Sequence, residues 1–420
     1  MSPTGGHWLS GHPPDRGSSR DPGHPPDLIA HVLALAREYL EMDVAVVSEF
    51  TQGEQVYRFI EGDGGSFGFQ VDEGVLLEET YCHRVVGGSL PNLIADANKE
   101  PQVRHLKATR DADIGSYIGV PLMFSDGRVY GTLCCLSHRA DPSLRARDVR
   151  FMHMLARMVA DHLERGEREQ EWHRRQVRQI QELLRGRRLR MVFQPIIHLG
   201  TNKVAGLEAL ARFDAAPRYS PDQWFAQAAE VGLGTGLELT AFRAALDHLD
   251  SVPQDAYLSV NVSPETAMCP GLVDALACVS GERIVLEMTE HARVTEYGAL
   301  DRALTEVRDQ GVRLAIDDVG AGFASLKHIL RLAPDIIKLD VALTRRVDAD
   351  PARRAMVSSL VSFAWEVGSV VIAEGVQTER ELSCLRQLGV TYGQGYYLAP
   401  PKPLLASATS RGHPNSMRDG

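Results

Sequence analysis

The chain of 420 residues is short of cysteine, and the six cysteines that it has are not arranged as a structural framework. No two of them form a Cys-X-X-Cys pair, and none has the spacing to histidine that zinc sites use. We therefore expect no structural zinc and predict free thiols in a reducing cytoplasm. The six are Cys82, Cys134, Cys135, Cys269, Cys278 and Cys384.

The sequence also lacks a long apolar run and an excess of positive charge. No stretch approaches the roughly 20 apolar residues of a membrane-spanning helix, and no basic-then-apolar signal peptide begins it. We therefore expect a cytoplasmic protein without a membrane span. The net charge of -10 argues against a general nucleic-acid-binding surface, so a phosphate ligand would have to be met by local groups or metal ions.

The chain has room for two or three domains between two polar ends. Residues 1–26 repeat Pro, Gly, His, Ser and Asp without apolar periodicity, which predicts a disordered tail. Residues 407–420 are predicted to form a second tail. The histidines of the first tail could bind metal weakly, although scattered solvated side chains are the simpler interpretation.

Residues 27–162 mix helical and strand patterns. A helix is predicted over 28–40, and a long amphipathic helix from about residue 147 closes the segment. Asp-Gly at 126–127 lies between two apolar runs, which is a hairpin signal. Together these patterns predict a small α+β domain. Its predicted strands are 44–49, 55–60, 117–124 and 129–136.

Residues 163–188 are predicted to be a charged helical linker with a narrow apolar stripe. Such a stripe suits a coil that joins two chains, so we predict a homodimer. An isolated, solvated linker helix is the alternative. The stripe consists of Leu163, Trp172, Val177, Ile180, Leu183 and Leu184.

Residues 189–406 repeat one pattern, in which a short β-branched run ends in a polar residue and a helical segment follows. From Asn261 onward, the intervals between successive polar residues are 26, 30, 21, 36 and 20 residues, enough for a strand, a helix and two turns. This spacing predicts an α/β barrel of the TIM type, in which the carboxyl ends of the strands converge on one mouth. The polar residues are Glu208, Asn261, Glu287, Asp317, Lys338, Glu374 and Gln394. Isolated acidic residues at strand ends often cap helices, but capping alone does not explain several glutamates and a lysine in succession.

Two adjacent aspartates, Asp317 and Asp318, stand where one of these strands becomes a glycine-rich loop. Asp317 can face the mouth, and Asp318 can turn back towards it because Gly320 and Gly322 permit unusual backbone angles. A convergent set of carboxylates and an amide suits Mg²⁺ or Mn²⁺. Two such ions can clamp both oxygens of an in-line phosphoryl displacement, so the pattern predicts phosphodiester hydrolysis.

The first domain resembles the GAF family of small-ligand sensor domains. The resemblance rests on "YCHRVVGGSLPNLIADA" at 81–97 and "IGSYIGVPLMFSDGRVYGTLCCLS" at 114–137. These motifs specify the fold more than a ligand, which stays unknown. Cys82 followed by His83 is similar to a bilin-attachment pair, but here the pair precedes the Asp-containing segment. We therefore predict that Cys82 is a packed residue at a helix start.

The barrel segment resembles the EAL family of cyclic di-GMP phosphodiesterases over roughly 215 residues. The matching motifs occur in the family's order: "FQPI" at 193–196, "LEALARF" at 207–213, "SVNVS" at 259–263, "LEMTE" at 286–290, "IDDVGAG" at 316–322, "IKLD" at 337–340, "AEGV" at 373–376 and "QGYYLAPP" at 394–401. The resemblance implies a barrel whose first strand is antiparallel. It also implies cyclic di-GMP as the substrate and linear pGpG as the product.

The resemblance further implies a role for each matching residue. One metal ion would be held by Glu208, Asn261, Glu287 and Asp317, and the second by Asp317, Asp318 and Glu374. Lys338 would contact the attacking water, and Glu290 would anchor the loop at 318–325. Substrate would be met by Gln194, Arg212, Asp340 and Gln394.

Two positions depart from the family pattern, and neither removes an implied ligand. The usual Asp-Asp-Phe-Gly-Thr-Gly is Asp-Asp-Val-Gly-Ala-Gly here, and the usual second glutamate of Glu-Gly-Val-Glu is Gln377. We therefore predict an active phosphodiesterase regulated by the GAF domain. The alternatives are a catalytically weak EAL domain that acts as a cyclic di-GMP receptor and an unrelated metal-dependent barrel hydrolase. No diguanylate cyclase motif is visible.

Overall fold

A computed structural model of the chain describes residues 25–185, 188–289, 296–320 and 325–404, and it divides into two compact units. The first unit extends to Trp172, and the second begins at His173. The predicted tails lie outside the described residues, except that Pro25 and Pro26 already belong to the first helix, α1. None of the helices in the described ranges is long and apolar enough to cross a membrane.

The first unit is built on a six-stranded antiparallel sheet in the order β3-β2-β1-β6-β5-β4. The predicted hairpin is confirmed, because β5 and β6 pair across the turn at 125–127. The strands are β1 (Val44–Thr51), β2 (Glu54–Gly62), β3 (Gly74–Leu76), β4 (Leu93–Ile94), β5 (Ser116–Met123) and β6 (Val129–Ser137). The helices are α1 (Pro25–Leu40), α2 (Tyr81–Val86), α3 (Lys107–Asp111) and α4 (Ala146–Arg185), with short 3₁₀ turns at Gly65–Phe67 and Leu77–Glu79.

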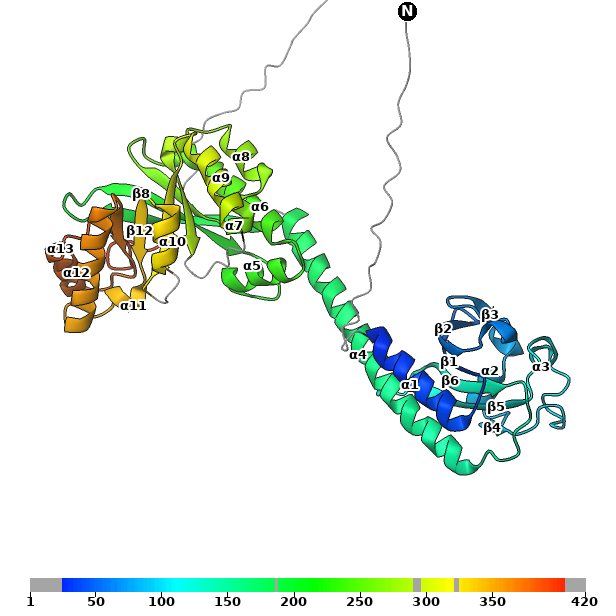
Figure 1. Cartoon of the computed structure of the whole chain (residues 1–420). Coiled ribbons are helices and arrows are strands. Elements are labelled where there is room, and N and C mark those ends of the chain that lie inside the picture. Colours follow the sequence, from blue (N-terminus) through cyan, green and yellow to red (C-terminus); the bar gives the residue numbers. More distant parts are fainter. Residues whose placement is uncertain (1–24, 186–187, 290–295, 321–324, 405–420) are drawn as a thin grey trace, which may run out of the picture. The chain divides into compact units, whose positions relative to one another are not determined.

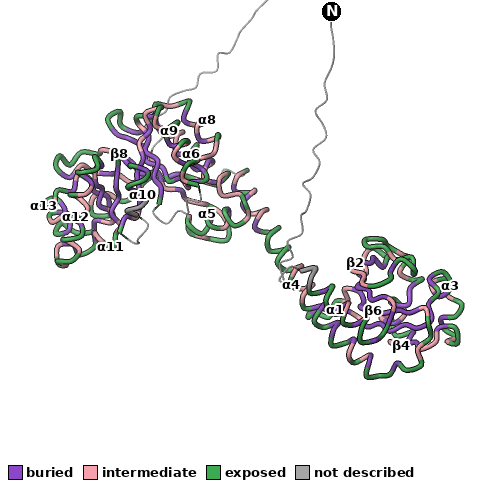
Figure 2. The backbone as a smooth tube through the Cα atoms, viewed as in Figure 1, coloured by how far each residue is buried: buried purple, intermediate pink, exposed green. Residues whose placement is uncertain are grey.

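The sheet has a hydrophobic core on each face. Neighbouring residues of a strand point to opposite faces, so Cys135 packs against α1 and α4 while Cys134 packs on the side of α2. Figure 1 shows α1 and α4 side by side, and the central strand β6 appears as a largely buried segment in Figure 2. Cys82 is buried in α2, which confirms that it is a packed residue near a helix start.

The second unit is a closed eight-stranded barrel in the order β10-β11-β12-β13-β14-β7-β8-β9. Only β7 runs antiparallel to both of its neighbours, as the family resemblance implied, and the other pairs are parallel. The strands are β7 (Leu189–His198), β8 (Val204–Phe213), β9 (Tyr257–Asn261), β10 (Ile284–Thr289), β11 (Arg313–Val319), β12 (Ile336–Leu339), β13 (Val370–Ala373) and β14 (Tyr392–Gly393).

Helices follow most of these strands and surround the barrel (Figure 1). They are α5 (Pro221–Glu230), α6 (Gly234–Leu246), α7 (Pro264–Ala267), α8 (Pro270–Leu276), α9 (Tyr297–Arg308), α10 (Ser325–Leu332), α11 (Val341–Thr344), α12 (Pro351–Glu366) and α13 (Glu379–Gln387). The alternation of parallel strands and helices confirms the predicted α/β barrel.

The side chains inside the barrel form layers, and these layers determine how far along the barrel axis the site lies. Six buried apolar side chains from six strands pack together as a floor: Ile196, Tyr257, Val285, Ala315, Ile336 and Ile372. Because side chains alternate along a strand, the residues two positions further on face the same interior. On five parallel strands these residues are Ser259, Glu287, Asp317, Lys338 and Glu374. The polar residues therefore lie one layer above an apolar floor.

The apolar side chains near the end of α4 pack against other helices of the same chain. Ile180 and Leu183 are buried in a cluster with Trp224, Ala228 and Leu237 from α5 and α6. This part of the stripe therefore has an intrachain partner and does not need a second chain, although the side chain of Trp172 is 43% exposed. The predicted homodimer stays a prediction.

Candidate active site

The polar residues predicted from the strand ends come together at the carboxyl end of the barrel. Each stands among the last three residues of its strand or directly after the strand, except Glu208 and Gln194, which face each other across the antiparallel β7–β8 pair. Salt bridges and hydrogen bonds join seven of the predicted residues into one cluster: Gln194, Glu208, Glu287, Asp317, Lys338, Glu374 and Gln394. Asn261 joins them through a hydrogen bond to Glu208.

Lys338 is the centre of this cluster and is completely buried. Its ammonium nitrogen lies 2.7 Å from Glu374 Oε1 and 2.8 Å from Glu287 Oε2. It also lies 3.2 Å from Asp317 Oδ1 and 3.8 Å from Glu208 Oε2. One cation thus faces four carboxylates, which leaves an excess of negative charge in a largely dry site.

The pKa values reflect this imbalance. Burial raises the pKa of Glu374 to about 8 in spite of Lys338, and neighbouring carboxylates add to the effect. Burial likewise raises the pKa of Glu287 well above its usual range. For Lys338, burial lowers the pKa, but the four carboxylates outweigh burial and hold it well above its usual value. Further positive charge would therefore stabilise the ionised cluster.

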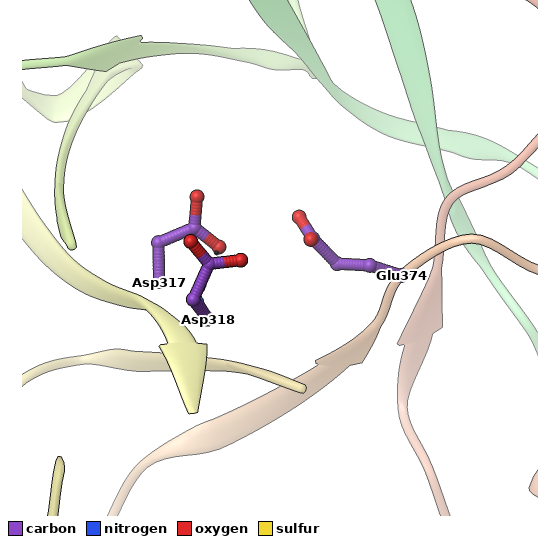
Figure 3. Close-up of side chains that lie close together, drawn as sticks. All are labelled: Asp317, Asp318 and Glu374. Carbon is purple, nitrogen blue, oxygen red and sulfur yellow. Dashed lines mark hydrogen bonds between the residues drawn. The ribbon is translucent and has the colours of Figure 1, made fainter. Parts of the chain in front are cut away.

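Asp317 and Asp318 turn towards the same space, as predicted. Oxygens of Asp317, Asp318 and Glu374 all lie within 4.8 Å of one another, and Figure 3 shows the three carboxylates pointing into one gap. Burial and the charges of Asp317 and Asp340 raise the pKa of Asp318 to about 6. The unusual backbone angle lies on Asp318 itself, whose φ is +59°, as well as on Gly320, whose φ is +111°. Gly322 lies outside the described residues.

Amide side chains hold Glu208 in place. Gln394 Nε2 donates to Glu208 Oε2 over 2.6 Å and to Gln194 Oε1 over 3.1 Å. Asn261 Nδ2 donates to the other oxygen of Glu208 over 3.1 Å. Gln194 in turn donates to the carbonyl oxygen of Ala399 over 3.1 Å. Gln194 and Gln394, which the resemblance assigned to substrate, therefore also fix the orientation of a predicted ligand.

Sequence analysis missed two residues that support the site. Ser259 is fully buried and donates to Glu287 Oε1 over 2.5 Å. Its place two residues before Asn261 on β9 puts it on the same strand face, which was the available signal. Glu381 is buried and accepts hydrogen bonds from the backbone N–H groups of Gln377, Thr378 and Arg346, so it fixes the segment that follows Glu374.

The remaining predicted residues have other surroundings. Arg212 donates to the carbonyl oxygen of Ala211 over 2.8 Å and is half-buried. Asp340 accepts from Ala342 N and begins α11, so it is a helix cap beside the site. Gln377 is exposed, with only its backbone held by Glu381. The prediction for Glu290 lies outside the described residues.

The donor set fits divalent cations. Asp317, Asp318 and Glu374 offer one group of hard oxygen ligands. The second group that the resemblance implies, Glu208, Asn261, Glu287 and Asp317, is connected by contacts with Lys338 and by the hydrogen bond from Asn261 to Glu208. The uncompensated carboxylate charge around Lys338 is the observation that supports this fit.

The fold and the site define a barrel protein of the TIM type with an acidic, lysine-centred site at its mouth. The chain belongs to the EAL domain family, whose model matches residues 177–401, and it also contains a GAF domain, matched over residues 24–163.

Three known proteins each match about half of this chain. The solved structure of the PaMucR phosphodiesterase in complex with c-di-GMP has a TM-score of 0.50 and 26% identity, over 55% of this chain and 98% of that one. An uncharacterized protein of Mycobacterium tuberculosis is 30% identical over 231 residues, which are 51% of this chain and 75% of the relative. The probable cyclic di-GMP phosphodiesterase PdeG of Escherichia coli is 26% identical over 223 residues, 50% of this chain and 44% of PdeG. This chain thus spans less than half of PdeG.

The raised pKa of Glu374 predicts how the cation-free barrel responds to pH. The pKa of this carboxyl is about 8 in the folded protein and about 4.5 in the unfolded chain, so the folded protein binds more protons between these pH values. Its unfolding free energy should therefore fall as pH rises from about 5 to about 8. The variant Glu374→Gln lacks this titration, so wild type should lose stability relative to the variant over this range.

Urea unfolding in EDTA, followed by the fluorescence of Trp224, measures this difference. Trp224 is buried in the barrel unit, whereas Trp172 and Trp365 are exposed already. Added Mn²⁺ should reduce the loss because cations favour the ionised carboxylates. A wild type that gains stability over the variant as pH rises in EDTA would contradict the pKa assignment.

Proposed function

We propose that this protein hydrolyses cyclic di-GMP to linear pGpG by metal-assisted phosphodiester cleavage, under control of its GAF domain. The observation that carries the proposal is the cluster of four carboxylates around buried Lys338 at the barrel mouth. Two further observations support it. Every side chain that the resemblance implies as a metal ligand is present, and a similar solved structure of a phosphodiesterase contains c-di-GMP. We also propose that the protein acts in the cytoplasm.

Two divalent cations, when bound, would polarise the scissile phosphate and lower the pKa of the attacking water. Glu208, Asn261, Glu287 and Asp317 would hold one of them, and Asp317, Asp318 and Glu374 the other. The contacts of Glu208 with Asn261 and Gln394 keep its oxygens oriented before anything binds. The site is therefore largely pre-organised.

Lys338 contributes a fixed positive charge where negative charge develops on the phosphate. Its nitrogen is held by Glu287 and Glu374, so its position does not depend on substrate. Because its pKa is held well above the usual value, Lys338 stays charged and acts as an electrostatic stabiliser rather than as a base. Asp340, which lies beside Asp318, would line the substrate pocket.

A receptor without turnover is the second candidate function. It would require the loss or displacement of ligands, and among the described residues each implied ligand is present. Gln377, the departure nearest to Glu374, is exposed and its backbone is anchored by Glu381. The geometry therefore favours turnover.

Substitution of Glu208 tests the assigned site. Glu208→Gln keeps the size of the side chain but removes a charged oxygen ligand, so we expect kcat/KM for cyclic di-GMP to fall at least about 100-fold. Glu230→Gln, an exposed position on α5, is the matched control and should leave the rate unchanged. The measurement is pGpG formation by chromatography, with circular dichroism to verify folding.

Calcium is an independent probe of the same site. Its longer bonds and looser coordination would misplace the reacting groups, so Ca²⁺ should inhibit the enzyme in Mg²⁺ or Mn²⁺. Substantial activity of Glu208→Gln, or strong activity of wild type in Ca²⁺ alone, would sink the two-cation assignment.

The phase of α4 tests control by the GAF domain. A ligand can change barrel activity only if it favours one of two arrangements of the connecting segment. Two alanines inserted after Gln176 would rotate the following helix by about 200°, while seven would restore the phase to within about 20°. The insertion lies before Ile180 and Leu183, whose packing on the barrel it leaves intact.

We expect the two-residue insertion to change the rate of hydrolysis several-fold and the seven-residue insertion to change it much less. A coupling free energy of about 1–3 kcal/mol corresponds to about 5–150-fold in activity. Analytical ultracentrifugation of each variant also tests the proposed homodimer. Equal rates in all three proteins would show that α4 is only a tether.

A further inference from the structure

Two cysteine side chains meet in the core of the GAF domain. Cys82 on α2 and Cys134 on β6 are both buried, and their sulfur atoms lie 3.8 Å apart. The Tyr117 hydroxyl lies 3.4 Å from the Cys82 sulfur, and Gln55 Nε2 donates to that sulfur over 3.5 Å. Together with Thr132, these groups give Cys82 four polar neighbours in an otherwise apolar cluster.

The thiol pair borders a cavity and is not sealed in the core. The cavity has a volume of about 320 Å³, and both cysteines line it together with Gln55 and Tyr117. Exposed Glu79 and Lys107 also line it, so it reaches the surface of the domain. The cavity thus gives a small molecule such as water or hydrogen peroxide a path from the surface to the two cysteines.

The surroundings make the two thiols unequal. The hydrogen bond with Cys134 lowers the pKa of Cys82 to about 7, against the effect of burial. The same contact and burial raise the pKa of Cys134. Cys82 is therefore the stronger candidate for the thiolate, and Cys134 remains a protonated thiol beside it.

Cys135 is a natural comparison within the same strand. It follows Cys134 on β6 but points to the opposite face, into the core against α1 and α4. It does not line the cavity, and burial alone raises its pKa above the usual range. Cys134 therefore lies beside a second thiol and lines the cavity, whereas the adjacent Cys135 is buried on the opposite face of the sheet.

We propose that Cys82 and Cys134 are a modification site, a dithiol that peroxides convert reversibly into a disulfide. In the first step the Cys82 thiolate attacks a peroxide oxygen, which breaks the O–O bond and gives a sulfenic acid and hydroxide. In the second step the Cys134 sulfur attacks the Cys82 sulfur, its proton goes to the departing oxygen, and water leaves. The two sulfurs are oxidised by two electrons in total, and the peroxide is reduced.

The disulfide would change the wall of the cavity. A disulfide bond is about 2.05 Å long, so the sulfurs would have to approach each other from their present contact. The Cys82 sulfur would then accept weaker hydrogen bonds from Tyr117 and Gln55. The carboxamide oxygen of Gln55 already has no protein hydrogen-bond partner. Oxidation would in this way alter the part of the domain where a small ligand would fit.

Peptide mapping of the full-length protein tests the proposal. The background is Cys278→Ser, because Cys278 is exposed and would react on its own. After treatment with hydrogen peroxide and alkylation of free thiols in denaturant, we expect two fewer alkylated cysteines. We also expect a Cys82–Cys134 linked peptide in the mass spectrum, and dithiothreitol should restore both thiols.

Three further variants in the same background supply the controls. Cys82→Ser and Cys134→Ser should each abolish the linked peptide, whereas Cys135→Ser should leave it unchanged. Should a serine variant fail to fold, mapping of the parent protein alone still decides whether the bond forms.

The proposal is overturned if both thiols remain alkylatable in peroxide that oxidises Cys278 in wild type. It is equally overturned if Cys82 is oxidised to a stable sulfinic acid without pairing, or if the linked peptide disappears in a Cys135→Ser variant that folds like the parent protein.

Discussion

The ion pairs between Lys338 and four carboxylates are the interaction on which the barrel site depends. A fully buried ammonium group needs close partners, and Glu287 and Glu374 supply them within 2.8 Å. The four carboxylates, however, do not have enough positive charge beside them. One ammonium group cannot neutralise all four, and the side chains in the layer beneath the site are apolar. Protonation of some carboxyls or the presence of further cations would stabilise this centre, and divalent cations would meet that need.

The strand register explains why these groups meet. Five parallel strands each place a polar residue two positions beyond an apolar floor residue, so the polar residues share one height. The antiparallel β7–β8 pair adds Gln194 opposite Glu208, and Gln394 connects the two. A shift of one residue in any parallel strand would exchange its floor and site residues for outward-facing ones.

The regular spacing of the strands also explains which features of the barrel and its site could be predicted from the sequence. The polar strand ends, the barrel and the meeting of Asp317 with Asp318 were predictable because they follow from strand spacing and alternation. The positive φ of Asp318 was not, since its position had suggested that nearby glycines would absorb the turn. Ser259 and Glu381 were missed because a buried serine and a helix-capping glutamate are common in ordinary packing. The intrachain partner of Ile180 and Leu183 was hidden because an apolar stripe does not reveal what covers it.

Whether the lysine-centred cluster performs catalysis or only binding is the central question, and one assay answers it most directly. Purified full-length protein is incubated with cyclic di-GMP in Mn²⁺ or in EDTA, and both nucleotides are quantified by chromatography. The account predicts complete conversion to linear pGpG in Mn²⁺ and none in EDTA. Cyclic di-GMP that is bound by the protein but remains intact in Mn²⁺ and in Mg²⁺ would contradict it.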